Sequence, residues 1–346
     1  MIPHSKERYI NQEKTLPSRH GSIDNEHKFS IAQKMETRIN ETTISRESEG
    51  MRIDLYLSRR FTYLSRTAWK GEIIRGKISI NGRVVTNPHR RVSFGDLLRF
   101  DGMGYSEPEV SRDIRILYED ADILGVCKPG NLPVHPAGRY FNNTLLRILE
   151  HEHNRPLYPA HRLDRETSGV ILFAKNVSVA SQIQKNFSQV QKSYIAIVHG
   201  KPAEKRFAVN AQIGFDPASA IKKKRIVLPE SGETAVTYFM VLFSFGDYTL
   251  VRAQPQTGRL HQIRVHLLHA GYPIVGDKMY GRDEGAYLRF IASGETPELL
   301  ATLQFHRSAL HSRSIRFYHP VLKKDCVIKA PVPDDFKEFI ETRRYT

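Results

Sequence analysis

The order of short apolar runs over residues 113–335 is the sequence feature that most constrains the fold. Several runs have the length and the branched or aromatic content that are typical of β-strands. They are Ile114–Leu117, Ile123–Val126, Val170–Ala174, Tyr194–Val198, Val236–Phe243 and Tyr248–Arg252. Helical patterns at 143–151, 179–187 and 260–269 lie between them without regular alternation. This order predicts an α+β domain with a mixed, largely antiparallel sheet.

The chain is longer than one ordinary core accommodates, so its 346 residues are expected to form two domains and a tail. Residues 1–50 are polar and lack a sustained helical or strand period, so we interpret them as a mostly disordered tail. A small domain is expected at 51–108 and a larger one at 113–340. Residues 101–112 contain glycine, proline and mixed charges, and this composition is typical of a linker between domains.

The small domain is expected to combine two helices with a hairpin. A short helix begins at Ile53, and Ser65 has the position of an N-cap for a second helix that ends at Gly76. The Asn81-Gly82 pair lies between two apolar runs and predicts a tight hairpin turn. A last strand is expected at 97–100.

Positive charge is concentrated in the two expected domains. The net charge is +15, and residues 1–50 contribute none of it because they hold eight basic and eight acidic side chains. A basic folded region favours a polyanionic partner, most commonly nucleic acid. The candidate phosphate contacts in the small domain are Arg52, Arg59, Arg66, Lys70, Arg75, Lys77 and Arg83. In the larger domain, Lys222 and Lys223 are either phosphate contacts or part of a solvated turn.

Membrane, secreted and metal-binding classes are not favoured. No apolar run approaches the roughly 18 residues of a membrane span, and the start of the chain resembles neither a secretory signal nor a transit peptide, so a cytoplasmic protein is expected. Cys127 and Cys326 are too few for a disulfide framework or a cysteine-based zinc site. The histidines that invite a metal interpretation lack a recognised ligand spacing. They are His135, His161, His261 and His266.

The segment from His161 to Gly169 has the character of a loop that presents a catalytic group. It is polar and is followed directly by the apolar run at 170–174, so a rigid strand can hold it in place. Asp164 lies between Arg162 and Arg165, which would keep its carboxylate ionised and bring a phosphate backbone close to it. The charge pattern alone also fits a surface loop with ordinary ion pairs.

Four segments in order resemble the RluA family of pseudouridine synthases. The signature is "HRLDRETSGVILFAK" at 161–175, preceded by "VCKPGNLPVHPAGRY" at 126–140. It is followed by "KSYIAIVHG" at 192–200 and "PQTGRLHQIRVHLLHAGYPIVGDKMYG" at 255–281. Separately, "MRIDLYLSRRF", "SRTAWKGEIIRGKISINGRVV" and "VSFGDLLRF" make residues 51–100 similar to the αL RNA-binding module of the S-four type.

The resemblance implies an isomerase that needs no cofactor and no metal, with structured RNA as its partner. It makes Asp164 the catalytic carboxylate, which either attacks the sugar carbon or removes the neighbouring sugar proton. It makes Arg162 the residue that displaces the flipped base, Tyr194 the active-site tyrosine, and Arg264 the partner of Asp164. Each also has an ordinary structural interpretation, as an ion pair for either arginine and as core packing for Tyr194. Thr257 has the position of the N-cap of the helix that carries Arg264.

Two other functions remain open from the sequence. A non-catalytic RNA-binding protein could retain the fold, although it would need none of Asp164, Tyr194 and Arg264. A glycosylase that excises bases could also use an aspartate nucleophile. For a pseudouridine synthase, the S-four-type module favours ribosomal RNA, whereas "PVHPAGRY" also resembles relatives that modify tRNA. We expect a monomer.

Overall fold

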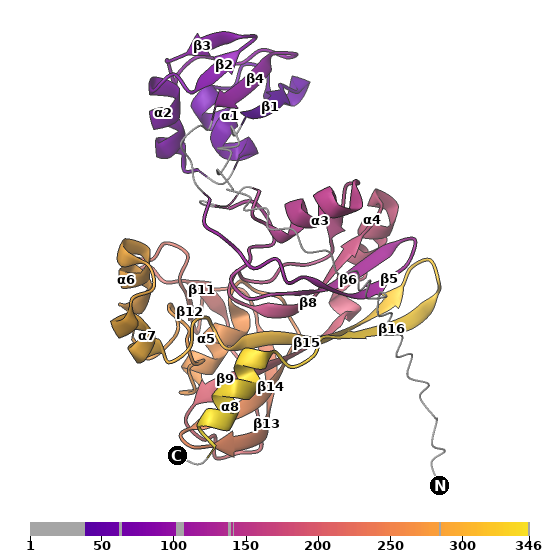
Figure 1. The fold of residues 1–346 in the computed structure, drawn as a ribbon, viewed down its shortest axis with the longest axis vertical. Coiled ribbons are helices and arrows are strands. Elements are labelled where there is room, and N and C mark those ends of the chain that lie inside the picture. Colours follow the sequence, from indigo (N-terminus) through magenta and orange to yellow (C-terminus); the bar gives the residue numbers. More distant parts are fainter. Residues whose placement is uncertain are drawn as a thin grey trace, which may run out of the picture.

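The computed structural model describes residues 39–61, 64–101, 107–137, 140, 142–283 and 285–344. Figure 1 shows a small domain, in indigo and purple, as a body separate from a larger domain built on an extended sheet. Among the described residues, no helix is long and apolar enough to cross a membrane.

The small domain packs two helices against a four-stranded antiparallel sheet with strand order β1-β4-β2-β3. The strands are β1 (Ile39–Thr43), β2 (Ile78–Ile80), β3 (Arg83–Val85) and β4 (Leu97–Asp101), and the helices are α1 (Ile53–Arg60) and α2 (Arg66–Ile74). Trp69 of α2 is completely buried and meets Phe100 of β4 edge to face, with 5.0 Å between ring centroids. This contact joins the helices to the sheet.

Local chemistry at the ends of these elements agrees with the sequence. The Ser65 hydroxyl accepts a hydrogen bond from the backbone N–H of Ala68, so it is the N-cap of α2. Gly76 ends that helix with φ +72°. Asn81 and Gly82 have φ values of 49° and 78°, as a hairpin turn of the type expected from Asn-Gly requires.

One strand lies in the stretch that was expected to be disordered. Ile39–Thr43 pairs with β4 over its whole length, from Ile39 opposite Asp101 to Thr43 opposite Leu97. Ile44 is completely buried beside it. The expectation of a tail up to residue 50 is therefore wrong from residue 39 onward, because a short edge strand needs no long apolar pattern of its own. Residues 1–38 lie outside the described part of the chain.

The larger domain is built on a ten-stranded sheet with the order β10-β13-β14-β9-β15-β8-β6-β5. Two further strands pair beside this path, β16 with β15 and β7 with β8. Among the described strand pairs, only β15 and β8 are parallel and the others are antiparallel. The predicted mixed, largely antiparallel α+β architecture is thus confirmed.

The bounds of the strands of this sheet are β5 (Arg115–Glu119), β6 (Ile123–Lys128), β7 (Tyr158–Pro159), β8 (Ser168–Ala174), β9 (Gln191–His199), β10 (Arg206–Asn210), β13 (Val236–Phe245), β14 (Tyr248–Pro255), β15 (Leu310–His319) and β16 (Lys324–Lys329). A separate hairpin consists of β11 (Ile213–Phe215) and β12 (Arg225–Val227). The helices are α3 (Leu145–His153), α4 (Val177–Lys185), α5 (Gln262–His269), α6 (Ala286–Ser293), α7 (Pro297–Leu303) and α8 (Asp334–Thr342).

Strand β8 lies at the centre of the domain, and every one of its residues is buried. Ile171 and Phe173 belong to the core that includes α3, whereas Val170 and Leu172 belong to the core that includes α4. Successive side chains of a strand point to opposite faces, so β8 is covered on both sides. This double burial explains the continuous apolar run in its sequence.

The larger domain begins earlier than residue 113. Glu107 accepts hydrogen bonds from the backbone N–H groups of Asn142 and Asn143, each at 2.8 Å, and the carbonyl of Pro108 accepts one from the Asn143 side chain. Val110 packs against the main core. Residues 107–112 therefore belong to the larger domain rather than to the linker, and Gly102 and Gly104 lie outside the described residues.

Candidate active site

The loop that carries Asp164 is anchored where the two parallel strands meet. Gly169, near the start of β8, has φ +106° and pairs with Ser312 of β15. A Cβ atom at Gly169 would lie 2.2 Å from the backbone oxygen of Ser312, so only glycine fits there. This close approach fixes the position of the loop relative to β15.

Buried polar contacts hold the same loop from its other side. Lys128 is completely buried, and its Nζ donates to the carbonyls of Pro129, Leu132 and Arg165, the last at 3.0 Å. Glu166 accepts from the backbone N–H of Ser308 at 2.9 Å. Lys128 lies in the sequence segment that precedes the signature, so the two neighbouring motifs meet around one buried lysine side chain.

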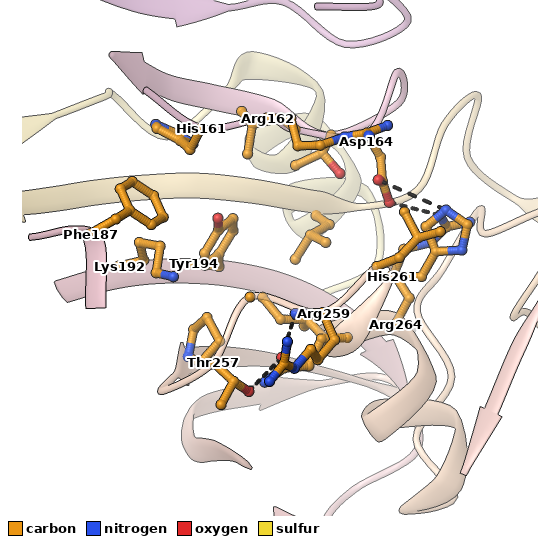
Figure 2. Close-up of a pocket in the computed structure, with 18 residues that line it drawn as sticks. His161, Arg162, Asp164, Phe187, Lys192, Tyr194, Thr257, Arg259, His261 and Arg264 are labelled. Atoms are coloured by element: carbon orange, nitrogen blue, oxygen red, sulfur yellow. Dashed lines mark hydrogen bonds and ion pairs between the residues drawn. The ribbon is translucent and has the colours of Figure 1, made fainter. Parts of the chain in front are cut away.

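A pocket of about 420 Å³ opens beside this loop. Residues from three of the four family-like segments line it, and Figure 2 shows them facing a common space. The lining includes His161, Arg162, Asp164, Phe187, Lys192, Tyr194, Thr257, Arg259, His261 and Arg264. The structure thus brings Asp164, Tyr194, Arg264 and Arg162 together, as expected for one site.

Arg264 joins two carboxylates. Its Nη1 donates to Asp164 Oδ2 at 2.8 Å, so the expected contact between these residues is present. Its Nε and Nη2 donate to the two oxygens of Asp277, at 2.6 and 2.8 Å. Asp277 is completely buried and also accepts the backbone N–H of Tyr280 at 2.9 Å. This bidentate pair fixes the guanidinium so that its remaining edge faces Asp164.

Asp277 is a residue of the site that the sequence interpretation missed. It lies within the quoted segment 255–281 but follows a Gly in a loop, where an acidic residue is ordinarily exposed. Its contacts give it the role of holding Arg264, which in turn touches Asp164. The signal that could have found it is that Asp277 is the only acidic residue in the segment that contains Arg264.

The two carboxylates are ionised at neutral pH. Burial acts to raise the pKa of Asp164, but the neighbouring Arg264 charge outweighs it, and the pKa lies below its ordinary value. Burial likewise acts to raise the pKa of Asp277, and Arg264 again outweighs it, which lowers that pKa to about 2. Asp164 therefore faces the pocket as an anion, the form needed by a nucleophile or a base.

His261 faces the second oxygen of Asp164. Its Nε2 lies 3.9 Å from Asp164 Oδ1, and its Nδ1 lies 2.8 Å from the hydroxyl of Tyr280. That hydroxyl accepts the backbone N–H of Arg225 at 2.8 Å, which leaves its own proton free for Nδ1. Nε2 would then carry the imidazole proton, which faces Asp164. Burial lowers the pKa of His261 to about 4, so the ring is neutral at pH 7.

The predicted N-cap of α5 is wrong. The helix begins at Gln262, after His261 in a left-handed conformation with φ 60°. The Thr257 hydroxyl instead donates to Gln262 Oε1 at 2.7 Å and accepts the backbone N–H of Val236 at 3.2 Å. Thr257 and Gln262 thus tie the segment before the helix to β13, a contact between distant parts of the sequence that local capping rules do not reveal.

Strand β9 contributes Tyr194 and Lys192 to the pocket (Figure 2). Tyr194 is buried, and burial raises its pKa to about 12, so its hydroxyl keeps its proton at neutral pH. The Nζ of Lys192 lies 5.1 Å from the ring centroid of Phe187. Burial lowers the pKa of Lys192.

Arg162 is exposed at the pocket, and within the described ranges it has no acidic partner.

Several of the cations predicted to contact phosphate have acidic partners instead. Arg52 and Arg66 both bind the completely buried Asp54, at 3.0 and 2.9 Å, and Arg75 pairs with Glu72. These three arginines have structural partners, so their availability for phosphate is reduced. The more open candidates are Arg59, Lys70, Lys77, Arg83, Lys222 and Lys223.

The residues that the structure describes contain no group of three or more His, Cys, Asp or Glu that could hold a metal ion. The basic four-residue run at 222–225 is not uniformly exposed. Lys222 and Lys223 are exposed, whereas Lys224 is buried and lies 3.5 Å from Asp216.

Comparison with known proteins defines the class. The family model for RNA pseudouridylate synthases matches residues 122–269, and the S4 domain model matches residues 51–98. A human structure, RNA Pseudouridylate Synthase Domain Containing 1, superposes with a TM-score of 0.53 at 25% identity over 65% of this chain and 86% of that one. The chain belongs to the RNA pseudouridine synthase family, and it is an isomerase with RNA as its substrate.

Curated relatives indicate which type of pseudouridine synthase the chain resembles. The ribosomal large subunit pseudouridine synthase D of Blochmanniella floridana is 32% identical, over 84% of this chain and 94% of the relative. The protein of the same description from Vibrio vulnificus is also 32% identical, over 90% and 96%. These relatives are of the RluA type, so the resemblance seen in the sequence is confirmed.

Proposed function

We propose that the chain isomerises specific uridines in structured RNA without a cofactor, using Asp164 as the reacting carboxylate. The observation that carries this proposal is the clamp of Arg264, which is held by the buried Asp277 and donates to Asp164 at 2.8 Å. The clamp keeps Asp164 charged and directed into a pocket of nucleoside size.

The residues of the pocket suit the steps of the reaction. The bond from the sugar to the ring nitrogen must break, the uracil must turn, and a bond from the sugar to a ring carbon must form. Ionised Asp164 either attacks the sugar carbon or removes the neighbouring sugar proton, and both routes begin from the same anion. The ring carbon then loses its proton to the ring nitrogen, so no atom is gained or lost overall. Tyr194, whose hydroxyl is protonated, provides a flat ring beside the uracil.

Arg162 would act on the conformation of the RNA rather than on the bond from the sugar to the ring nitrogen. A uridine in folded RNA is stacked, and it must leave the stack before it reaches Asp164. Arg162 is an exposed cation with no acidic partner in the described part of the chain, so it is free to occupy the vacated position. The small domain would bind the flanking RNA.

For the target we favour ribosomal RNA over tRNA, because the relatives described as acting on the large ribosomal subunit are similar over nearly their whole length. A cytoplasmic monomer is part of the same proposal.

Product analysis tests the function. RNA from cells that lack the gene is incubated with the purified protein, and pseudouridine and free uracil are measured. We expect pseudouridine at defined sites of ribosomal RNA and no free uracil. Unchanged RNA would indicate a binding protein, and free uracil would indicate a glycosylase. Gain of pseudouridine only in tRNA would overturn the choice of target.

A further inference from the structure

The hairpin of β11 and β12 is fixed firmly beside the active site. Figure 1 shows it next to α5, the helix that carries Arg264. Ile213 and Ile221 of the hairpin region form a small buried core with Val265 of α5 and with Met279 and Tyr280. The inner side of the hairpin is therefore packed against catalytic elements, and its outer side is free to serve another purpose.

An unusual pair occupies that outer side. The guanidinium carbon of Arg225 lies 3.4 Å from the ring centroid of Phe215, so the cation sits over the face of the ring. Phe215 is 60% exposed. A large aromatic ring in this state loses favourable burial unless something covers it.

The Arg225 cation lacks a counter-charge. Among the described residues it has no ion pair, and its Nε is buried without a hydrogen-bond partner. A buried Nε without an acceptor costs free energy, since this donor has lost water without gaining a partner. Stacking on Phe215 also holds it in one orientation. This is the arrangement of a preformed site for an anion with a flat group beside it.

The surroundings of the pair indicate which anion. Exposed Lys222 and Lys223 lie just before Arg225 in the chain, and Asp216, which follows Phe215, pairs with Lys224 instead. Glu233, which lies beside β11, pairs with Arg259. The backbone N–H of Arg225 donates to Tyr280, whose hydroxyl contacts His261, which faces Asp164. Two residues, Tyr280 and His261, thus lie between the backbone of Arg225 and the reacting carboxylate, so the hairpin neighbours the active site.

We infer that Phe215 and Arg225 form a binding subsite for an unpaired nucleotide that neighbours the target uridine. Its base stacks on the exposed Phe215–Arg225 surface, and its phosphate is bound by Arg225 with Lys222 and Lys223. The inference rests on the proposed function, because it requires RNA in the adjacent pocket. It assigns to the catalytic domain an RNA contact that is independent of the small domain.

The test measures RNA binding in an Asp164→Asn background, where no chemistry occurs. The probes are a stem-loop RNA with an all-uridine loop and a blunt RNA duplex of equal length. Phe215→Leu should weaken binding of the stem-loop about 5- to 150-fold, the range for loss of one stacked base, and leave duplex binding unchanged. Arg225→Gln should weaken it as well and reduce the salt slope by about 0.7–0.9, the value for one phosphate contact.

Matched controls separate this site from general effects. Phe243→Leu removes another exposed ring, and Arg206→Gln removes an exposed charge on the edge strand β10. Both should bind like the parent. The exposed pair Lys222→Gln/Lys223→Gln should reduce the salt slope without disturbing the hairpin, and thermal unfolding reports on the fold of each variant.

The inference is overturned if Phe215→Leu, Arg225→Gln and the lysine pair all bind the stem-loop with the affinity and salt slope of the parent. It is also overturned if these variants bind the stem-loop normally but, with Asp164 restored, form pseudouridine more slowly than the unmodified enzyme. The contact between Phe215 and Arg225 would then act only through His261. Pseudouridine formation by the unmodified protein is measured in parallel. Its absence would count against the proposed function and would leave the binding result to decide the subsite.

Discussion

Arg264 contacts the half-buried carboxylate of Asp164 and the completely buried carboxylate of Asp277, so its removal should have two separable effects. In Arg264→Met, turnover should fall strongly while RNA affinity changes little, because the lost contact acts on Asp164 and not on phosphate. The variant should also be destabilised by about 3–5 kcal/mol, because Asp277 is left buried and uncompensated. Single-turnover rates, RNA binding and urea unfolding measure the three effects.

A second substitution distinguishes the two effects. Adding Asp277→Asn to Arg264→Met removes the uncompensated charge, so part of the stability should return while turnover stays low. If RNA affinity falls as much as turnover in the single variant, Arg264 is an RNA contact instead.

The hydroxyl of Tyr194 should matter for the chemical step more than for binding. Tyr194→Phe keeps the ring beside the substrate but removes the proton that the raised pKa, about 12, retains on the oxygen. We expect a slower single-turnover rate with nearly unchanged RNA affinity. A rate equal to that of the unmodified enzyme would remove the hydroxyl from the mechanism.

Among single residues, the sequence identified those that carry motif chemistry and missed those that act through burial. Asp164, Tyr194 and Arg264 were expected together from the segments that contain them, and they line one pocket. Asp277 and Gln262 were missed because their importance comes from contacts with distant residues. Such contacts depend on the folded sheet and not on local pattern.

At the scale of elements, the junction of β8 and β15 determines where Asp164 lies. Gly169→Ala should therefore lower the free energy of unfolding by far more than the usual strain of a left-handed residue, since its Cβ would lie 2.2 Å from the Ser312 oxygen. Gly271→Ala is the matched control, with φ +84° and no atom within 4 Å of the added Cβ. Gly271→Ala should lower the free energy of unfolding by only about 1–2 kcal/mol. Equal unfolding free energies for the two variants would contradict this role of Gly169.

The same junction shows why the sequence predicted some strands and not others. Run 170–174 is wholly apolar because β8 is buried on both faces. Strand β15 was not predicted, although it is central to the sheet, because its buried start is polar: His311 and Ser312 are buried, and His311 bonds to Ser168. Polar residues that are buried only through tertiary contacts give no apolar period.

For the whole molecule, acid should destabilise the fold at pH values well above those at which carboxylates are protonated. Burial lowers the pKa of four histidines to about 4 and that of His311 to about 3, from an ordinary 6.5. Below pH 6.5 the unfolded chain binds more protons than the folded one, so stability falls as pH falls from about 6.5 to 4. Each group contributes up to about 1.4 kcal/mol per pH unit. Urea unfolding between pH 7.5 and 4.5 tests this, and equal stability at pH 7 and 5 would contradict it.

The small domain should contribute mainly to RNA binding, and the larger domain should carry out the reaction. A truncated protein that begins at Glu107 keeps the contacts of Glu107, Pro108 and Val110 with the larger domain. It should bind RNA more weakly and with a flatter salt dependence, because each lost phosphate contact lowers the slope by about 0.7–0.9. Its rate at saturating RNA should survive. An unchanged slope would mean that the small domain does not bind phosphate, and a collapsed rate in a folded protein would mean that it helps to build the active site.

The most direct test of the central claim is pseudouridine formation by Asp164→Asn. The amide is nearly isosteric with the carboxylate, so the fold and RNA binding should remain nearly intact, but it can act neither as nucleophile nor as base. Single-turnover reactions at saturating RNA compare the variant with the unmodified enzyme. We predict equal RNA binding and no detectable pseudouridine from the variant. Measurable pseudouridine from Asp164→Asn, free of the unmodified enzyme, would contradict the assignment of Asp164 as the reacting group.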